Sequence, residues 1–224
     1  MAHALRLKTG DVVGLYDGSG REGRARITGF FEGRVRVEII EVSRAPRSHV
    51  QITAALGILK GKKMDRVIRS LAELGIFRVA PFFSRRSAPA PVEGRMESKK
   101  KRWEKIAREA MKQSRGGRMM EIGPPGDFQA ALDAGRTCDL KLIFWEEEKT
   151  DLRQALEAAF PQGPPRPRTV RVMLGPEGGF EKGEAEKARR EGFVRASLGP
   201  RILRAETAAI AACVLAQHLF GDMG

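Results

Sequence analysis

The sequence is poor in the residues that disulfide frameworks, metal sites and membrane spans require. Its 224 residues include only two cysteines and three histidines, all at scattered positions, so no spacing typical of a zinc site occurs. No apolar run approaches the roughly 18 residues of a membrane-spanning helix. The N-terminal residues also lack the apolar middle segment of a signal peptide. We therefore expect a reduced, cytoplasmic protein without a metal ion or a membrane segment.

Acidic residues are few relative to basic ones. Lys and Arg total 41 against 28 Asp and Glu, which gives a formal net charge of +13. An excess of this size predicts a polyanionic partner. The basic residues form three clusters, at 60–69, at 85–86 and along 99–118. A solvated helix face would explain one cluster, but three favour nucleic acid. Aromatic residues make up only 6%, so contacts with backbone phosphates should outweigh base stacking.

The familiar phosphate-binding loops are absent as well, because the chain contains neither Gly-x-Gly-x-x-Gly nor Gly-Lys-Ser/Thr. Two other glycine loops stand near the C-terminus: Leu174-Gly-Pro-Glu-Gly-Gly-Phe180 and Leu198-Gly-Pro-Arg-Ile-Leu-Arg-Ala-Glu-Thr-Ala208. Each follows a short strand-like run and leads into sequence of helical composition. Open parallel α/β sheets bind ligands at the carboxyl ends of their strands. The two loops are therefore the predicted ligand site.

Four acidic residues crowd the first loop and the helix predicted after it, namely Glu177, Glu181, Glu184 and Glu186. This arrangement opposes a polyphosphate and would tolerate a cationic ligand. The alternative is local, because a helix N-terminus favours acidic side chains. For the last three residues, the helix terminus explains the acidic side chains as well as a cationic ligand does. It explains Glu177 less well, because Glu177 lies inside the loop.

The periodicity of the chain changes near residue 45. Residues 12–42 predict three strands with a turn at Asp17-Gly-Ser-Gly20, which suits a small β-barrel over 1–45. After a linker at 43–48, apolar strand-like runs alternate with amphipathic helical segments over 48–224. This alternation predicts a mainly parallel sheet. The expected strands are 50–59, 76–83, 140–145, 169–173 and 193–197, and the expected helices are 63–74, 99–114, 128–134, 151–159 and 206–220.

With these segments in view, the chain resembles the ribosomal RNA small subunit methyltransferase E family, in the SPOUT class of knotted methyltransferases. The resemblance covers nearly the whole chain, and the two C-terminal loops, in this order and at this spacing, are its most specific part. Its pieces are Asp17-Gly-Ser-Gly20, Glu73-Leu-Gly75, Arg102-Trp103, Glu109-Ala110, Gln113-Ser-Arg115, Gly175-Pro-Glu-Gly-Gly-Phe180, Leu198-Gly199, Arg201-Ile-Leu-Arg204 and Glu206-Thr-Ala208.

The resemblance implies a PUA-like β-barrel that binds RNA at 1–45 and a SPOUT methyltransferase domain at 48–224. The latter would be an α/β domain whose C-terminal part forms a deep trefoil knot. Only Met1–Ala4 precede Leu5-Arg-Leu-Lys8, whereas such proteins usually carry a further β segment there, so we expect a shortened barrel. The resemblance also implies a homodimer that transfers methyl groups from S-adenosyl-methionine to N3 of a uridine in 16S rRNA, within the small ribosomal subunit, and that releases S-adenosyl-homocysteine.

The family resemblance assigns binding of the methyl donor to the two loops. Glycines there let the backbone approach adenine and ribose, and apolar side chains would form walls for the adenine. Thr207 would either bind the donor or cap the last helix. The residues implied are Leu174, Gly175, Glu177, Gly178, Gly179, Leu198, Gly199, Ile202, Leu203 and Thr207.

The acceptor nitrogen poses the harder chemical problem. N3 of uridine carries a proton at neutral pH, so either a base removes it or a cation stabilises the imide anion. Arg201 and Arg204 are the predicted stabilising cations, and they could also hold phosphate. Glu206 could orient Arg204 or act as a base. We favour orientation, because neighbouring arginines make a carboxylate a weaker base.

N3 lies on the Watson–Crick edge, so the target base must be unpaired or flipped out. The basic helix at 99–115 would hold the flanking RNA, while Trp103 is expected in the core. Glu109 and Gln113 would contact the rim of the site or bond each other. The predicted RNA-binding residues are Arg6, Lys8, Lys100, Lys101, Arg102, Lys105, Arg108, Lys112 and Arg115.

Two alternatives to this function stay open. One is a SPOUT methyltransferase that modifies another RNA. The other is a non-catalytic RNA-binding protein of ribosome assembly. The alanine-rich last helix is consistent with close packing in a dimer, but helix propensity explains its alanines nearly as well.

Overall fold

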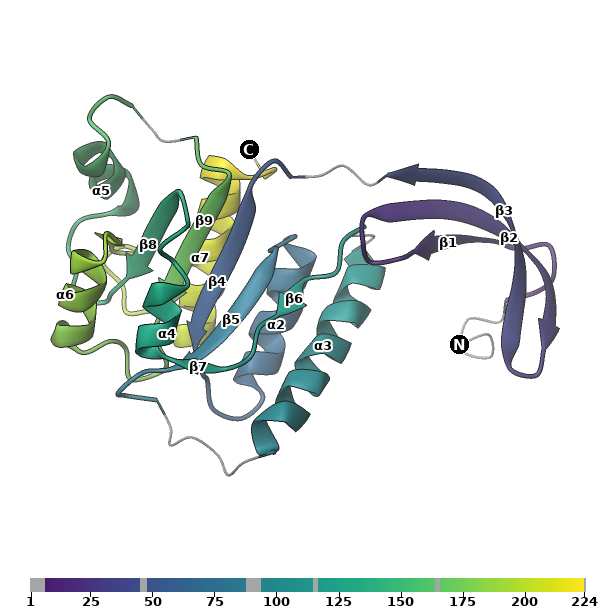
Figure 1. The fold of residues 1–224 in the computed structure, drawn as a ribbon, viewed down its shortest axis with the longest axis horizontal. Coiled ribbons are helices and arrows are strands. Elements are labelled where there is room, and N and C mark those ends of the chain that lie inside the picture. The colour runs from purple at the N-terminus through teal and green to yellow at the C-terminus, as the bar shows by residue number, and fades with distance from the viewer. Residues whose placement is uncertain (1–6, 45–47, 88–93, 115–116, 164–165, 224) are drawn as a thin grey trace. The chain divides into compact units, whose positions relative to one another are not determined.

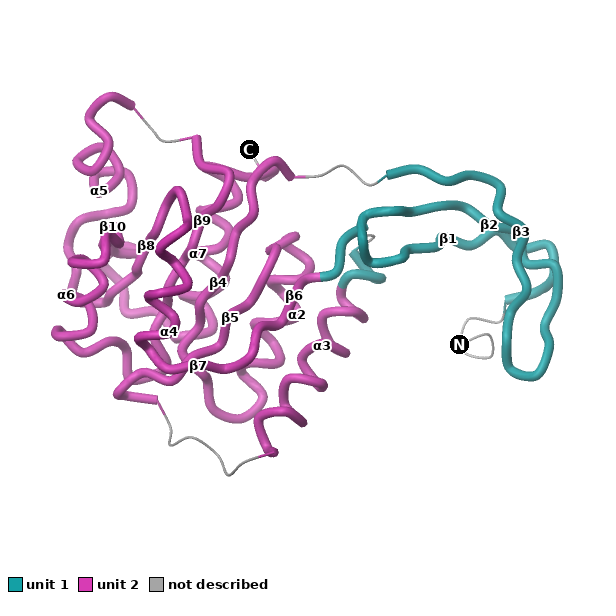
Figure 2. Tube along the Cα trace, in the orientation of Figure 1, with its two compact units in different colours: residues 1–47, 111–119 teal, residues 48–110, 120–224 magenta. Residues whose placement is uncertain are grey.

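We describe a computed structural model of the chain over residues 7–44, 48–87, 94–114, 117–163 and 166–223. Arg6 and Arg115, both predicted to bind RNA, lie outside these residues. The chain divides into two compact units, shown in different colours in Figure 2. The first comprises residues 1–47 and 111–119, and the second comprises residues 48–110 and 120–224. The sequence did not predict that 111–119 joins the first unit.

The first unit contains an antiparallel sheet in the order β1-β2-β3 (Figure 1), formed by Val12–Tyr16, Arg21–Phe31 and Arg34–Arg44. The predicted turn connects β1 to β2, and the Asp17 carboxylate accepts hydrogen bonds from the N–H groups of Ser19 and Arg21, at 2.7 and 3.1 Å. Residues 117–119 pair with this turn, because the Gly20 N–H donates to the Gly117 carbonyl at 2.9 Å. This pairing explains why residues distant in sequence belong to one unit.

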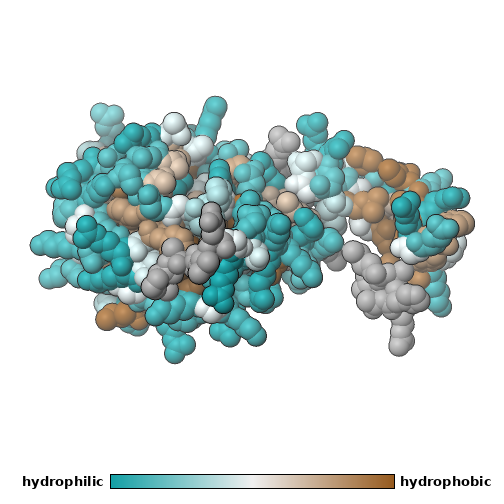
Figure 3. Space-filling model, turned by 60° about the horizontal axis from the view of Figure 1, so that its bottom comes forward, coloured by the Kyte–Doolittle hydropathy of each residue, from teal (hydrophilic) through white to brown (hydrophobic). Residues whose placement is uncertain are grey.

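The described strands of this unit do not close into a barrel. Three strands are too few to close a ring, and the sheet is open. Figure 3 shows apolar surface, in brown, on this unit at the right of the view. Ala25 and Ile27 are buried, but several large apolar side chains of this sheet are exposed. They are Val12, Leu15, Phe30, Phe31, Val35, Ile39, Ile40 and Val42.

The second unit is built on a sheet of seven strands in which every described pair is parallel, as the sequence predicts. The strand order is β10-β8-β9-β4-β5-β6, and β7 also pairs with β5. The strands are β4 (Gln51–Gly57), β5 (Arg78–Phe83), β6 (Glu121–Ile122), β7 (Gly126–Asp127), β8 (Leu140–Phe144), β9 (Thr169–Leu174) and β10 (Val194–Ala196). The two-residue strands β6 and β7 were not predicted, because so short a segment carries no periodicity.

Helices cover both faces of this sheet (Figure 1). They are α2 (Lys63–Glu73), α3 (Arg95–Ser114), α4 (Phe128–Asp133), α5 (Leu152–Ala159), α6 (Lys182–Arg190) and α7 (Ala205–Phe220). Helix α3 begins four residues before the predicted start. Asp151 caps α5 and accepts a hydrogen bond from the Gln154 N–H at 2.8 Å. None of the helices in the described ranges is long and apolar enough to cross a membrane.

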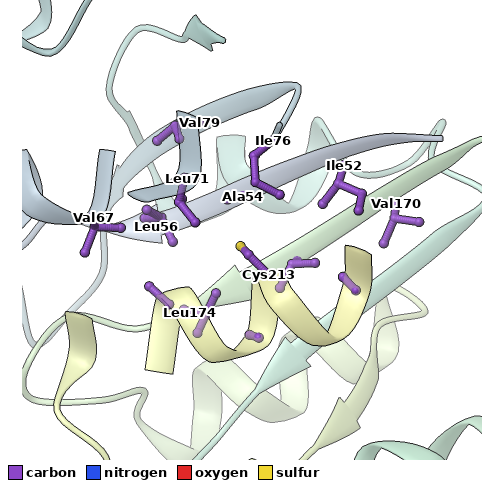
Figure 4. Packing of buried hydrophobic residues seen from close by; sticks show 14 of the residues in the cluster. Ile52, Ala54, Leu56, Val67, Leu71, Ile76, Val79, Val170, Leu174 and Cys213 are labelled. Carbon is purple, nitrogen blue, oxygen red and sulfur yellow. The ribbon is translucent and has the colours of Figure 1, made fainter. Parts of the chain in front are cut away.

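Side-chain alternation along the strands produces two hydrophobic clusters. Ile52, Ala54 and Leu56 of β4 face the larger cluster, which includes residues of α2, α3, α5 and α7. Figure 4 shows part of it, with Cys213 of α7 packed beneath the strands. Ala55 faces the smaller cluster, which includes residues of α4 and α6. Trp103 is 3% exposed and lies in the larger cluster, which confirms its predicted place in the core.

Candidate active site

A pocket lies at the carboxyl ends of three neighbouring strands, β8, β9 and β10. Both glycine loops line it, as predicted, because they follow β9 and β10. A third segment, which follows β8, lines it as well. The lining residues are Phe144–Glu146, Leu174–Glu177, Gly179, Ser197–Leu203, Ala205 and Ala208.

Close backbone approach explains several of the glycines. A Cβ atom on Gly57, at the end of β4, would lie 2.4 Å from the backbone nitrogen of Pro176, so only glycine lets the loop after β9 come this near. Gly179 has a φ of +68°, and a Cβ there would collide with the carboxylate of Glu146. Gly199 has a φ of +100° with open space around it. Glycine is therefore required there for its backbone conformation and not to avoid a collision. Gly57 and Glu146 were not predicted, because both requirements come from contacts between distant segments.

Glu177 anchors the loop after β9 to the start of α2. Its Oε1 accepts hydrogen bonds from the Lys60 N–H at 3.0 Å and from Lys63 Nζ at 3.1 Å. Partial burial is the largest single effect on its pKa and raises it. The hydrogen bonds and the charge of Lys63 together outweigh burial, so the pKa of Glu177 lies below its ordinary value. Glu177 is therefore an ionised carboxylate that already has a cation as partner.

The other three acidic residues of this region have structural roles, and only Glu184 bonds the backbone at the N-terminus of α6, as the helix-terminus alternative proposed. Glu184 is 5% exposed and accepts hydrogen bonds from the Glu181 and Arg85 N–H groups, both at 3.0 Å. Glu181 pairs with Arg85 at 3.4 Å. Glu186 pairs with Arg195 and Arg189, and the hydrogen bond from Arg195 is the main cause that lowers the pKa of Glu186. None of these three lines the pocket.

Comparison with known proteins identifies the family. A family described as "RNA methyltransferase domain" matches residues 46–217, and one described as "RNA methyltransferase PUA domain" matches residues 1–40. The ribosomal RNA small subunit methyltransferase E of Mesomycoplasma hyopneumoniae is 33% identical over 78% of this chain and 71% of its own length. This chain belongs to the ribosomal RNA small subunit methyltransferase E family. The family member from Bacillus subtilis is 28% identical over 93% of this chain and 82% of its own.

Solved structures of relatives have the same fold. The family member from Neisseria gonorrhoeae, bound to S-adenosyl methionine, has a TM-score of 0.86 at 29% identity and covers 100% of this chain and 89% of its own. A putative methyltransferase from Legionella pneumophila, in complex with the same cofactor, has a TM-score of 0.87 at 31% identity, with coverages of 99% and 88%. The predicted α/β fold with an N-terminal PUA-like region is thereby confirmed.

Two of the ten donor-binding residues implied by the family resemblance lie outside the pocket lining. The carbonyl of Gly178 accepts a hydrogen bond from Arg86 Nη1 at 3.0 Å, and this glycine packs against Arg86. Thr207 lies in the first turn of α7 and is exposed. It does not cap the helix either: Arg204 occupies the N-cap position, and its side chain makes no capping bond. The cap is therefore a wrong prediction.

The three residues predicted to act on the acceptor are placed differently from one another. Arg201 lines the pocket and is exposed, whereas Arg204, also exposed, and Glu206 are outside the lining. Within the described residues, no ion pair or hydrogen bond joins Glu206 to either arginine. The Oε2 atom of Glu206 is instead buried without a hydrogen-bond partner. The predicted orientation of Arg204 by Glu206 is thus not formed in this structure.

The basic residues of α3 separate into paired and unpaired groups. Arg102 donates from Nε and Nη2 to the same oxygen of Asp65, Oδ2, at 3.1 and 2.6 Å, and Lys100 pairs with Glu104 at 3.5 Å. The exposed residues Lys101, Lys105, Arg108 and Lys112 have no ion pair with any described residue. Their spacing places them on one face of the helix. Glu109 and Gln113 are exposed and make no bond to each other, and Lys8 is exposed as well.

The histidine, cysteine and acidic residues form no metal site in the part of the chain that the structure describes, since no three of them lie close enough to hold an ion. Cys213 is fully buried, and burial raises the pKa of its thiol to about 12. Its sulfur therefore serves as a small apolar group in the core.

Proposed function

We propose that this chain transfers a methyl group from S-adenosyl-methionine to N3 of a specific uridine in 16S rRNA. One observation carries the proposal: the two glycine loops characteristic of the family line one pocket at the carboxyl ends of β8, β9 and β10. Family members of similar fold are described as bound to this cofactor. Assignment to the small subunit rests on the names of the relatives.

The residues of the pocket fit S-adenosyl-methionine. The close approaches at Gly57, Gly175 and Gly179 let the loop after β9 fold tightly against its neighbours, so that its backbone forms one wall of the pocket. Leu174, Leu198 and Leu203 supply apolar walls for an adenine, and neighbouring backbone groups can bond its edge. We assign donor binding to the predicted residues that line the pocket. When bound, the donor supplies a methyl group on a positively charged sulfur.

The chain's own residues would prepare the acceptor. Arg201, which is exposed at the pocket, stabilises the imide anion of the uridine when the N3 proton leaves. Arg204, three residues further, binds the adjoining phosphate or shares this task. The buried Oε2 of Glu206 is available to accept a hydrogen bond from Arg204 when RNA draws the loop inward. The site chiefly positions the two reactants and excludes water.

We propose that RNA backbone lies along Lys101, Lys105, Arg108 and Lys112 of α3, and that residues 1–45 are an RNA-binding domain in addition to the catalytic domain at 48–224. As in the SPOUT class, the last segment would thread a loop to form the knot. We further propose a homodimer that works on the small subunit in the cytoplasm. Apolar residues on α7 and on the loop before it support the dimer, since Leu215, Leu219 and Ile202 are 37%, 48% and 93% exposed.

The decisive experiment is mass spectrometry of 16S rRNA nucleosides from a strain that lacks this gene. We expect 3-methyluridine to disappear and to return when the gene is restored. Complementation with Arg204→Ala should not restore the modification, whereas Arg153→Ala should, because Arg153 is 88% exposed in α5 and pairs only with Glu157. Undiminished 3-methyluridine in the deletion strain would show that the substrate assignment is wrong.

The alternatives give different results. A SPOUT enzyme for another RNA would bind S-adenosyl-methionine in calorimetry, yet leave 3-methyluridine in 16S rRNA unchanged upon deletion. A non-catalytic assembly protein would release no heat with the donor.

A further inference from the structure

We infer that Glu146 distinguishes the positively charged methyl donor from its neutral product and so favours product release. The inference rests on the proposed function, because it concerns the same pocket. It assigns a specificity role to a residue outside the two glycine loops.

The argument begins with the charged side chains that line the pocket, which are Glu146, Glu177 and Arg201. Glu177 is neutralised by Lys63, at 3.1 Å. Arg201 would repel a cation. Glu146 has no ion pair or hydrogen bond through its side chain with any described residue, so its negative charge is uncompensated. Of the charges at the pocket, it is the one positioned to attract a cationic ligand.

The neighbours of Glu146 hold its backbone in place. Before it, Trp145 donates from Nε1 to the Phe180 carbonyl at 3.3 Å, and its N–H donates to the Ala196 carbonyl at 3.2 Å. After it, Glu148 accepts hydrogen bonds from two N–H groups and pairs with Arg195 at 3.2 Å. The three consecutive glutamates therefore differ in role, and only the first lines the pocket.

The contact with Gly179 directs the Glu146 carboxylate toward the first glycine loop. The space that a side chain at residue 179 would fill is the space that the carboxylate occupies. The positive φ of Gly179 and the absence of its side chain thus serve one arrangement, in which an acidic group lies against the donor loop.

Methyl transfer changes the charge that Glu146 meets. The bond between sulfur and the methyl carbon breaks, its electron pair stays on sulfur, and the methyl carbon bonds to N3, whose proton has passed to solvent water. The sulfur changes from a cation to a neutral thioether, while the amino and carboxylate groups of the ligand are unchanged. Attraction to Glu146 therefore contributes to binding of the donor and is lost in the product.

The test compares the affinities of purified full-length protein for S-adenosyl-methionine and S-adenosyl-homocysteine by calorimetry. Glu146→Gln should weaken binding of the donor by about fivefold, as expected for one exposed charge pair, and leave binding of the product unchanged. Glu147→Gln is the matched control, because Glu147 is exposed and outside the pocket lining. It should change neither affinity. Added salt should weaken binding of the donor to the wild type more than to Glu146→Gln.

The outcomes separate this inference from the proposed function. If the wild type binds neither ligand, the proposed function is wrong. If the wild type binds both, but Glu146→Gln weakens them equally or not at all, the inference is wrong, because the carboxylate then meets a group that both ligands share. An unchanged melting temperature of the ligand-free variant would establish that the substitution leaves the fold intact.

Discussion

At the scale of single residues, Gly179 is needed both for its positive φ and for the space that it leaves to the Glu146 carboxylate. Substitutions at two different glycines can distinguish these two effects. Alanine at residue 179 must adopt a positive φ, which costs about 1 kcal/mol or more, and its Cβ must displace the Glu146 carboxylate. We expect Gly179→Ala to lower affinity for S-adenosyl-methionine by at least roughly tenfold. Calorimetry measures this directly.

Gly163 provides the control for Gly179. Its φ is +118°, and no atom lies within 4 Å of the position that a Cβ would take there. It is also far in sequence from the pocket loops. Gly163→Ala should reduce stability through the same backbone strain and leave donor affinity unchanged. Equal losses of affinity in the two variants would mean that strain alone, without the Glu146 contact, explains the effect.

Arg171 in β9 carries a charge that is unfavourable in its buried position. It is 4% exposed, its Nε has no hydrogen-bond partner, and it forms no ion pair with a described residue. Burial is the main cause that lowers its pKa, and the like charge of Arg78 acts in the same direction. Replacing an unsatisfied buried charge with an apolar group of similar length removes a desolvation cost. Arg171→Met should therefore raise the free energy of unfolding by about 1 kcal/mol.

Urea unfolding monitored by circular dichroism tests this increase, with Arg153→Met as the control for loss of an exposed arginine. A less stable Arg171→Met protein would show that the guanidinium contributes favourable interactions in solution.

At the scale of elements, α3 presents the clearest electrostatic prediction. Lys101, Lys105, Arg108 and Lys112 share one face, and none has an ion pair with a described residue. Changing all four to Gln should weaken RNA binding and reduce the slope of log affinity against log salt by roughly 0.7 for each lost phosphate contact. Arg102→Gln should mainly lower stability, because it breaks the pair with Asp65. Fluorescence titrations at several salt concentrations measure the slope, and an unchanged slope would exclude this face from the RNA interface.

Much of the element pattern could be predicted, because helices and strands of the second unit carry their periodicity in the sequence. The boundaries of α2, β8 and β9 agree with the prediction within one residue. Contacts between elements could not be predicted. The pair between Arg102 and Asp65 joins residues 37 positions apart, whereas the sequence predicted Arg102 as an RNA-binding residue. The third pocket segment after β8 was missed for the same reason, since the adjacency of β8 to β9 and β10 is set by the order of the sheet.

At the scale of the whole molecule, the apolar surface of α7 predicts self-association. Leu215 and Leu219 lie one turn apart and are 37% and 48% exposed, and Ile202 is 93% exposed although it lines the pocket. An apolar pocket wall exposed to water is incomplete, and a second copy packed on α7 would cover it. The double variant Leu215→Glu, Leu219→Glu should therefore be monomeric, and it should bind the donor more weakly because Ile202 stays uncovered.

Light scattering coupled to size-exclusion chromatography gives the oligomeric state, and calorimetry gives the affinity. Because both leucines are exposed, the monomer should keep its helical circular dichroism. Val42→Glu is the matched control, since Val42 is 64% exposed on the three-stranded sheet of the first unit and should leave the dimer intact. If the wild type is a monomer, the dimer proposal is wrong. If the α7 variant stays dimeric while Val42→Glu dissociates, the interface lies on the first unit. In that case bound RNA, and not a second copy of the chain, would cover Ile202.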